Sequence, residues 1–219
     1  MIPKIFQQLT YWPTYLFLRL VFGYKVEGRE NLKGLEHRAV IFASNHASYF
    51  DGPVSAAAMP RNSLVPKDFF PVRFLVLEPY FRYFKSPFPI LISLFTASYV
   101  RINGSIPIRK GLGDLNKALS NAVSCANDCG RIWIYPEGRI TEDGKLQPGK
   151  RGVAFLQKET GAPIVPVGIS GTFGMVSLKT FFGKTKIKVK IGKPIYSFKN
   201  PDALEENVEK VMSEIAKLI

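Results

Sequence analysis

The chain has 219 residues, of which 46% are hydrophobic and 21% are charged. This composition excludes a disordered or low-complexity polypeptide and fits one globular domain with a sizeable core. The net charge is +13; the last twenty residues hold five acids and two bases, so the remainder has 28 bases, 12 acids and a charge of +16. A basic body either attracts an anionic partner, such as nucleic acid or an anionic lipid surface, or is evenly solvated, and charge alone does not choose.

Residues 3–23 contain many aromatic side chains and predict a weakly amphipathic helix that Pro13 interrupts. Amphipathic rings concentrate at the headgroup boundary of a bilayer. We therefore expect residues 1–30 to form a membrane-associating helical segment, with a helix packed on the core as the alternative. The rings concerned are Tyr11, Trp12, Tyr15, Phe17 and Phe22.

This segment does not predict a signal peptide, because Arg19 breaks its apolar stretch and no small-residue cleavage site follows. Two uncharged runs rich in aromatic residues, 5–18 and 86–100, have 14 and 15 residues. A helix needs about 20 apolar residues to cross a bilayer. We therefore expect attachment at the membrane surface, monotopic or peripheral and on the cytoplasmic face, without a crossing.

The first half of the chain then shows three further patterns. Residues 39–43 form a continuous apolar run, which predicts a buried strand, and residues 54–59 predict a short helix. Residues 68–101 combine prolines, aromatic rings and cations. We expect them to form a broken hairpin of amphipathic helices that faces the membrane, or else a buried helical excursion of the core.

The second half alternates helical and strand patterns. Apolar residues at helical spacing predict a helix over residues 112–129 that stops at Gly130, and Asn200-Pro201 is expected to cap a final helix. Lysines alternate with apolar side chains over residues 184–191, as in a half-buried strand. The other predicted elements are strands over 132–135 and 164–169 and a helix from 152 to 158. This alternation indicates an α/β fold, and without a repeat or linker we expect one domain over residues 31–219.

The two cysteines, Cys125 and Cys129, are spaced i and i+4 on the predicted helix. A zinc site needs about four ligands, and the only other soft candidates are His37 and His46. We therefore expect no metal, and we interpret the cysteines as buried small residues in a reducing compartment.

A polar Asn45-His46 pair follows the apolar strand, and Asp51 comes five residues after the histidine. Ligands in α/β folds bind at the carboxyl ends of strands. Imidazole is the usual general base near neutral pH, and a carboxylate on its other nitrogen fixes the tautomer. The segment therefore predicts a base and its partner, if it forms a turn that enters a helix. A capping asparagine beside a surface histidine is the alternative.

Three further blocks accompany this pair. Glu137-Gly138-Arg139 follows another apolar strand and offers backbone amides and a guanidinium to an anion, although an ordinary turn explains it equally well. Arg109 and Lys110 place two cations after a short extended segment. The strand over residues 164–167 contains a proline, which suggests a pocket wall or an edge position.

In this order, the four blocks resemble the glycerolipid acyltransferase family typified by 1-acylglycerol-3-phosphate acyltransferases. The resemblance covers residues 38–170 and rests on Asn-His-x4-Asp followed by Pro-Glu-Gly. It implies an α/β core of helices around a mostly parallel sheet, held at the membrane surface. It also implies His46 as the base, Asp51 as its partner and Asn45 or backbone amides near the oxyanion. The residues that would bind the acceptor are Arg109, Lys110, Glu137, Gly138 and Arg139.

The implied activity is transfer of a fatty acyl chain from acyl-CoA or acyl carrier protein to the free hydroxyl of 1-acylglycerol 3-phosphate. It requires no cofactor and no covalent enzyme intermediate. Two departures from the family pattern concern the acceptor. Lys110 stands where an arginine is usual, and Glu-Gly-Arg-Ile-Thr replaces Glu-Gly-Thr-Arg-Ser. The second variant is similar to the subgroup that acylates lysophosphatidylethanolamine, which is the alternative acceptor.

Two other classes of function compete. A serine hydrolase would use Ser170 or Ser48, but Thr172 breaks the Gly-x-Ser-x-Gly pattern around Ser170. A non-catalytic binding protein would use only the basic surface. Its ligand would be an anionic membrane rather than nucleic acid, because the aromatics cluster in apolar stretches and no nucleic-acid-binding motif is present.

Overall fold

The computed structural model describes residues 1–60, 65, 68–83, 89–109, 113–175 and 185–219. Lys110, a predicted site residue, and residue 184, the first of the predicted strand over 184–191, lie outside these ranges. The elements, in chain order, are α1 (Ile2–Phe22), β1 (Lys25–Glu27), η1 (Arg29–Leu32), β2 (Val40–Ser44), α2 (Asp51–Ala58), β3 (Val72–Leu77), η2 (Glu78–Phe81), α3 (Ile90–Ile102), β4 (Ile106–Ile108), α4 (Leu115–Asn127), β5 (Arg131–Ile134), α5 (Gly152–Thr160), β6 (Ile164–Ser170), β7 (Lys188–Ile191) and α7 (Leu204–Ala216).

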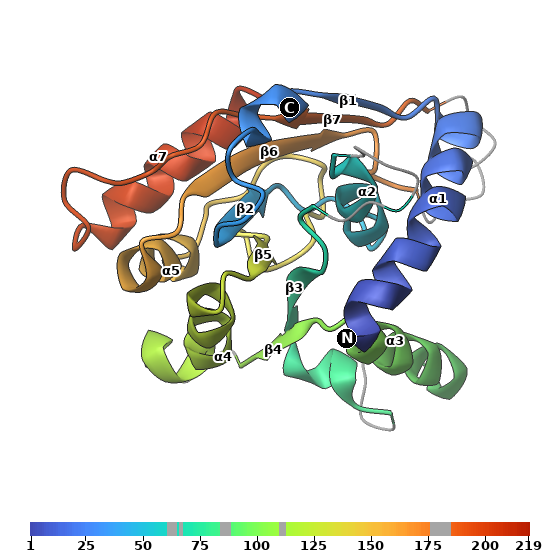
Figure 1. Cartoon of the computed structure of the whole chain (residues 1–219), viewed down its shortest axis with the longest axis horizontal. Coiled ribbons are helices and arrows are strands. Elements are labelled where there is room, and N and C mark those ends of the chain that lie inside the picture. The colour runs from blue at the N-terminus through green and yellow to red at the C-terminus, as the bar shows by residue number, and fades with distance from the viewer. Residues whose placement is uncertain (61–64, 66–67, 84–88, 110–112, 176–184) are drawn as a thin grey trace.

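The strands form one sheet in the order β1-β7-β6-β2-β5-β3-β4. Strands β6, β2, β5, β3 and β4 run parallel, whereas β7 is antiparallel to β6 and carries β1 parallel to itself. Helices cover both faces of the sheet (Figure 1). The predicted α/β fold with a mostly parallel sheet is confirmed. Strand β6 lies inside the sheet, so the edge position that its proline suggested is wrong.

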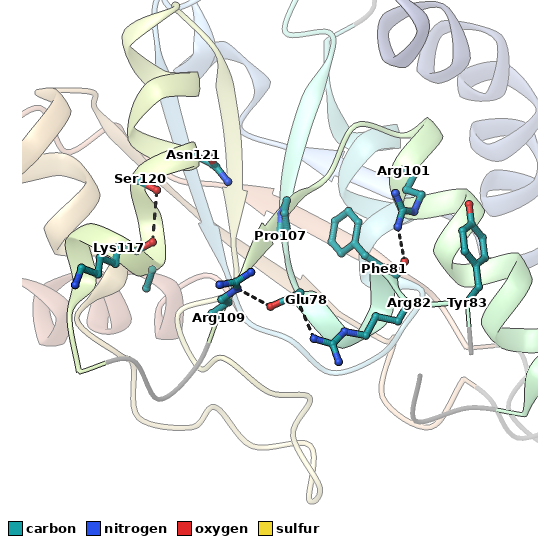
Figure 2. A pocket seen from close by; sticks show the side chains of 11 residues that line it. Glu78, Phe81, Arg82, Tyr83, Arg101, Pro107, Arg109, Lys117, Ser120 and Asn121 are labelled. Atoms are coloured by element: carbon teal, nitrogen blue, oxygen red, sulfur yellow. Dashed lines mark hydrogen bonds and ion pairs between the residues drawn. The ribbon is translucent and has the colours of Figure 1, made fainter. Parts of the chain in front are cut away.

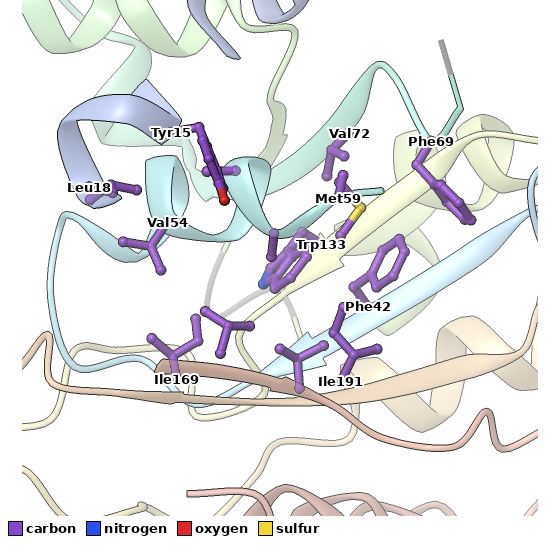
Figure 3. Packing of buried hydrophobic residues seen from close by; sticks show 14 of the residues in the cluster. Tyr15, Leu18, Phe42, Val54, Met59, Phe69, Val72, Trp133, Ile169 and Ile191 are labelled. Carbon is purple, nitrogen blue, oxygen red and sulfur yellow. The ribbon is translucent and has the colours of Figure 1, made fainter. Parts of the chain in front are cut away.

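Strand β2 shows why both faces must be covered. All five of its residues are buried. Val40 and Phe42 point into a cluster with α1 and α2, part of which Figure 3 shows. Ile41 and Ala43 point into a second cluster with α4, α5 and α7. A strand with apolar side chains on both faces has no solvated side, which is why the sequence showed a run rather than an alternation.

Helix α1 packs on the first of these clusters through one face. Its buried residues recur at helical spacing: Gln7, Tyr11, Tyr15, Leu18 and Phe22. The expectation that Tyr11, Tyr15 and Phe22 sit at a headgroup boundary is therefore wrong, because the core buries all three. Phe17, in contrast, is exposed.

The Gln7 side chain connects α1 to the start of β3 and to the end of α3. Its Oε1 accepts the backbone N–H of Val72 at 2.8 Å. Its Nε2 donates to the carbonyls of Val72 and Asn103 at 2.7 and 2.8 Å. A buried amide with these three bonds is satisfied, and it fixes the start of β3 and the end of α3 against α1.

Three side chains from the first thirty residues bond backbone carbonyls of α2 and of the residue that follows it. The Tyr11 hydroxyl donates to the Met59 carbonyl at 3.1 Å, and the Tyr24 hydroxyl donates to the Val54 carbonyl at 2.7 Å. Arg29 Nε donates to the Ala58 carbonyl at 2.9 Å. The Ala58 and Met59 carbonyls lie at the helix end, where carbonyls lack partners within the helix, and the three bonds together fix the helix whose first residue is Asp51.

Several local predictions are corrected. Residues 72–77 form strand β3 rather than part of a helical hairpin, because their run of Val, Phe and Leu fits a strand beside β5. Helix α4 ends with Cys129, not Gly130, in the left-handed conformation at φ 55°. Cys129 is exposed rather than buried. Helix α7 begins at Leu204, three residues after the predicted Asn200-Pro201 cap.

Candidate active site

His46 follows β2 at the carboxyl end of the strand, and Asp51 is the first residue of α2. The turn between them brings His46 Nδ1 to 2.9 Å from Asp51 Oδ2. The same oxygen accepts the backbone N–H groups of Ala47 and Ser48 at 2.7 and 2.8 Å. Asp51 is fully buried. The predicted meeting of the two side chains therefore occurs, and three donors converge on one carboxylate oxygen.

This arrangement leaves one imidazole nitrogen for chemistry. Because a carboxylate oxygen accepts hydrogen bonds, Nδ1 is the nitrogen that carries the proton, and Nε2 keeps its lone pair. The His46 side chain retains 19% of its surface exposed, so the base is open to a substrate. The Asp51 carboxylate would stabilise an imidazolium at this position.

The Tyr135 ring covers one face of the imidazole. The His46 and Tyr135 ring centroids are 3.9 Å apart, with planes at 14°. The Tyr135 hydroxyl is buried near Ser55 Oγ and Asp51, and neither hydroxyl has a partner of hydrogen-bonding geometry within the described residues. Burial first, and then the Asp51 charge, raise the pKa of Tyr135 well above its ordinary value. Tyr135 was not among the predicted site residues, although its place directly after β5 is a signal for one.

Glu137 joins the two loops of the site. Its Oε1 accepts the backbone N–H of His46 at 2.7 Å, and its Oε2 accepts the backbone N–H of Gln147 at 2.7 Å. Only 2% of Glu137 is exposed. Burial raises the pKa of Glu137, although both amides oppose the shift. The structure thus places this carboxylate inside the protein, where it holds the backbone of His46; contact with a substrate stays a prediction.

The loop after Glu137 also contacts the histidine segment. The Thr141 N–H donates to the His46 carbonyl at 2.9 Å. Gly138 has φ +65°, and a side chain there would meet Lys150 at 3.2–3.3 Å. Arg139 is exposed, with Nη2 3.3 Å from Gln147 Oε1. Lys150 and Arg139 therefore bring two cations to this loop. Lys150 was not predicted, because it comes eleven residues after Arg139, the last residue of the motif.

The Asn45 side chain bonds the backbone of β6. Its Nδ2 donates to the Ile169 carbonyl and its Oδ1 accepts the Ile169 N–H, both at 2.8 Å. This pair joins the carboxyl ends of β2 and β6 next to His46. Asn45 therefore positions the strand end, while its predicted role at the oxyanion stays a prediction.

Arg109 also lies at the carboxyl ends of the strands, but on a different strand from His46. It follows β4, and two strands, β5 and β3, separate β4 from β2. Its Nε donates to Glu78 Oε2 at 2.6 Å. The structure thus brings together Asn45, His46, Asp51 and the Glu137-Gly138-Arg139 loop, but it leaves Arg109 outside this group. Lys110 lies outside the described residues.

The two serines that a hydrolase would use lie in ordinary backbone environments of the described chain. Ser48 Oγ accepts the backbone N–H of Phe50 at 3.2 Å, as in a turn. Ser170 is the last residue of β6. Over the described ranges, His, Cys, Asp and Glu side chains form no group of three that could hold a metal ion.

Comparison with known proteins decides the family. A family model described as Acyltransferase matches residues 23–170, which include every element of the site. The chain belongs to the Acyltransferase family. A 1-acyl-sn-glycerol-3-phosphate acyltransferase of Saccharomyces cerevisiae is 28% identical over 220 residues, covering 95% of this chain and 66% of that protein. The human 1-acyl-sn-glycerol-3-phosphate acyltransferase beta is 24% identical over 78% of this chain and 55% of that protein.

The chain therefore spans about half to two thirds of the length of these two acyltransferase relatives. Among solved structures, the 1-acyl-sn-glycerophosphate acyltransferase PlsC of Thermotoga maritima aligns with a TM-score of 0.62 at 21% identity. The alignment covers 97% of this chain and 80% of that one. At this identity, the likeness establishes the acyltransferase fold.

Proposed function

We propose that this acyltransferase moves a fatty acyl group from a thioester donor to the free hydroxyl of 1-acylglycerol 3-phosphate. One observation carries the proposal: the 2.9 Å contact of His46 Nδ1 with Asp51 at the carboxyl end of β2. It leaves Nε2 as a general base at the carboxyl ends of the strands, and acyl transfer to an alcohol needs such a base.

The chemistry follows from this geometry. The acceptor hydroxyl gives its proton to His46 Nε2 while its oxygen attacks the thioester carbonyl. The carbonyl carbon becomes tetrahedral, and its oxygen takes the negative charge. The carbon–sulfur bond then breaks, and the imidazolium returns the proton to the departing thiolate. Asp51 stabilises the imidazolium between the two proton transfers.

Cations beside the base support an acceptor that carries a phosphate. Arg139 and Lys150 lie on the loop that bonds His46 through Thr141. In glycerol phosphate, about four bonds separate the reacting oxygen from phosphorus, a reach of about 5 Å at about 1.2 Å per bond. A phosphate held by Arg139 would thus place the adjacent hydroxyl near the imidazole. We assign the acceptor's anionic group to this loop.

An apolar surface supports attachment to a membrane. Leu9 and Leu20 on α1 are 72% and 82% exposed, and Leu91 and Phe95 on α3 are 77% and 71% exposed. Phe6 packs edge-on against Tyr99 at 6.1 Å, which joins α1 to α3. No described helix is long and apolar enough to cross a bilayer. We propose that these two helices rest on the membrane surface, from which the lipid acceptor enters.

The identity of the acceptor is tested with a panel. Purified protein in detergent would receive radiolabelled acyl-CoA with lysophosphatidate, lysophosphatidylethanolamine or lysophosphatidylcholine. We expect labelled phosphatidate to form at least tenfold faster than the other products. Faster acylation of lysophosphatidylethanolamine would instead support the acceptor that the Glu-Gly-Arg-Ile-Thr loop sequence suggests. Arg139→Gln should raise KM for lysophosphatidate more than it lowers kcat, whereas the nearby exposed Lys145→Gln should change neither.

A further inference from the structure

A cationic cleft lies beside the edge strand β4, away from His46. It has a volume of about 1050 Å³ and is bounded by η2, β4 and the first turns of α4. Figure 2 shows the charged side chains that line it among the described residues: Arg82, Arg101, Arg109, Lys117 and one acid, Glu78. With four cations and one acid among the described residues of its lining, this concave site suits a ligand with several negative charges.

Internal contacts hold these cations in place. The two oxygens of Glu78 accept Arg82 Nη2 at 3.1 Å and Arg109 Nε at 2.6 Å. These two bonds hold the pKa of Glu78 below its ordinary value, and the bond with Arg82 contributes most to the shift. Arg101 Nη2 donates to the Phe81 carbonyl at 2.8 Å, and its guanidinium lies 5.2 Å from the Tyr83 ring centroid. Each guanidinium has five N–H groups, so donors remain for phosphate oxygens.

The distance to His46 argues against the phosphate of the acceptor. His46 follows β2, and Arg109 follows β4, three positions away in the order β2-β5-β3-β4. At about 4.8 Å per strand, the separation is about 14 Å. The acceptor's phosphate lies only about 5 Å from its reacting hydroxyl. A lysolipid reacting at His46 therefore does not reach this cleft with its phosphate.

A phosphopantetheine thioester does span this distance. About 13 bonds separate its sulfur from its first phosphorus, a reach of about 16 Å when extended. In coenzyme A, a second phosphate, an adenine ring and a 3′-phosphate follow. Phe81 and Pro107 give the cleft an apolar wall beside its cations, a surface on which a purine ring can pack.

We propose that the cleft binds the nucleotide end of acyl-CoA, while the pantetheine arm follows the edge of the sheet to His46. The inference rests on the proposed function, because it gives the donor of that reaction its own site. A concave cleft of this volume, with cations and an apolar wall side by side, fits a nucleotide that carries several phosphates. Arg109 then binds the donor rather than the acceptor.

The test begins with binding alone, so that it does not depend on turnover. Titration calorimetry on the full chain would measure the Kd of coenzyme A and of 3′-dephospho-coenzyme A. Lys117→Glu reverses one charge at a residue that is 78% exposed, and an acid in the first turn of α4 favours the helix. We expect Lys117→Glu and Arg101→Gln each to weaken coenzyme A binding at least tenfold. Loss of the 3′-phosphate should weaken binding by a similar factor.

Lys217→Glu is the matched control, because Lys217 is also an exposed lysine paired with an acid three residues earlier. It should leave the Kd within twofold. Wild-type protein that binds no coenzyme A, or uses only acyl carrier protein, overturns the inference. So does a Lys117→Glu protein with an unchanged Kd and a raised KM for lysophosphatidate. If cleft variants weaken binding but lysophosphatidate is not acylated, the donor site stands and the proposed acceptor is wrong.

Discussion

The backbone N–H of His46 donates a 2.7 Å hydrogen bond to the carboxylate of Glu137, although 91 positions separate the two residues in the sequence. The second oxygen of that carboxylate holds the Gln147 N–H. The glutamate of the Pro-Glu-Gly block therefore fixes the backbone of the base. This contact explains why two distant motifs occur in one site, since each completes the hydrogen bonding of the other.

Replacing Glu137 with glutamine should lower kcat without a matching rise in KM. A glutamine has one acceptor oxygen, so either His46 or Gln147 loses its partner, at a cost of about 1.5–3 kcal/mol. If that cost falls on the transition state, kcat drops about 10- to 100-fold. Glu142→Gln, an exposed change on the same loop, is the control in steady-state assays. A rise in KM for the acceptor with kcat preserved would show that Glu137 contacts substrate instead.

The pH dependence of stability should also report Glu137. Burial raises the pKa of this carboxyl above its ordinary value of 4.5. The folded state therefore holds its proton at pH values where the unfolded state has released it, and stability falls as pH rises through that window. Urea denaturation should give a larger difference in unfolding free energy, wild type minus Glu137→Gln, at pH 4 than at pH 7. The opposite order would mean that the two amides outweigh burial.

The stack of Tyr135 on His46 predicts different results for two substitutions. Tyr135→Phe keeps the ring and removes a buried hydroxyl, so kcat should stay within about threefold. Tyr135→Leu removes the aromatic face that stabilises an imidazolium by about 0.5–2 kcal/mol. It should lower kcat about 2- to 30-fold and move the acid limb of the pH–activity profile to lower pH. Equal kinetics for the two variants would assign the ring a packing role alone.

The exposed face of α1 should determine membrane binding. Leu9→Glu with Leu20→Glu places two charges on the proposed contact surface, away from the buried face. We expect sedimentation with phosphatidylglycerol vesicles to fall at least tenfold, while the melting temperature stays within about 3 °C. Ile219→Glu, at an exposed apolar residue on another part of the chain, should sediment like wild type. Unchanged sedimentation of the double variant would place the membrane contact elsewhere.

The parts of the fold that local patterns specify were predicted well. Strands β2, β5 and β6 show continuous apolar runs because both of their faces are buried. Strand β7 shows an alternation because only one of its faces is buried. Strand β3 was missed because its neighbours Pro71 and Pro79, with the aromatic rings around them, resemble a membrane-facing segment. Its identity as a strand depends on pairing with β5, whose paired residues lie 59 positions further along the chain. Such pairing leaves no local pattern.

In the site too, contacts between residues close in the sequence were predicted, whereas contacts between distant segments were not. His46 and Asp51 were paired correctly because five residues separate them and a turn suffices. The internal bonds of Glu137 and Asn45 were not predicted, since each joins segments that only the sheet brings together. The location of Arg109 also depends on strand order, which the sequence does not reveal.

If His46 is the base of an acyl transfer, removing it must stop product formation, which matched variants measure directly. Wild type, His46→Ala and Asp51→Asn would receive radiolabelled acyl-CoA and lysophosphatidate, with circular dichroism confirming that each is folded. The account predicts labelled phosphatidate from wild type, a loss of about 10²- to 10⁴-fold for Asp51→Asn, and still less product from His46→Ala. A folded His46→Ala protein that makes phosphatidate at the wild-type rate would contradict it.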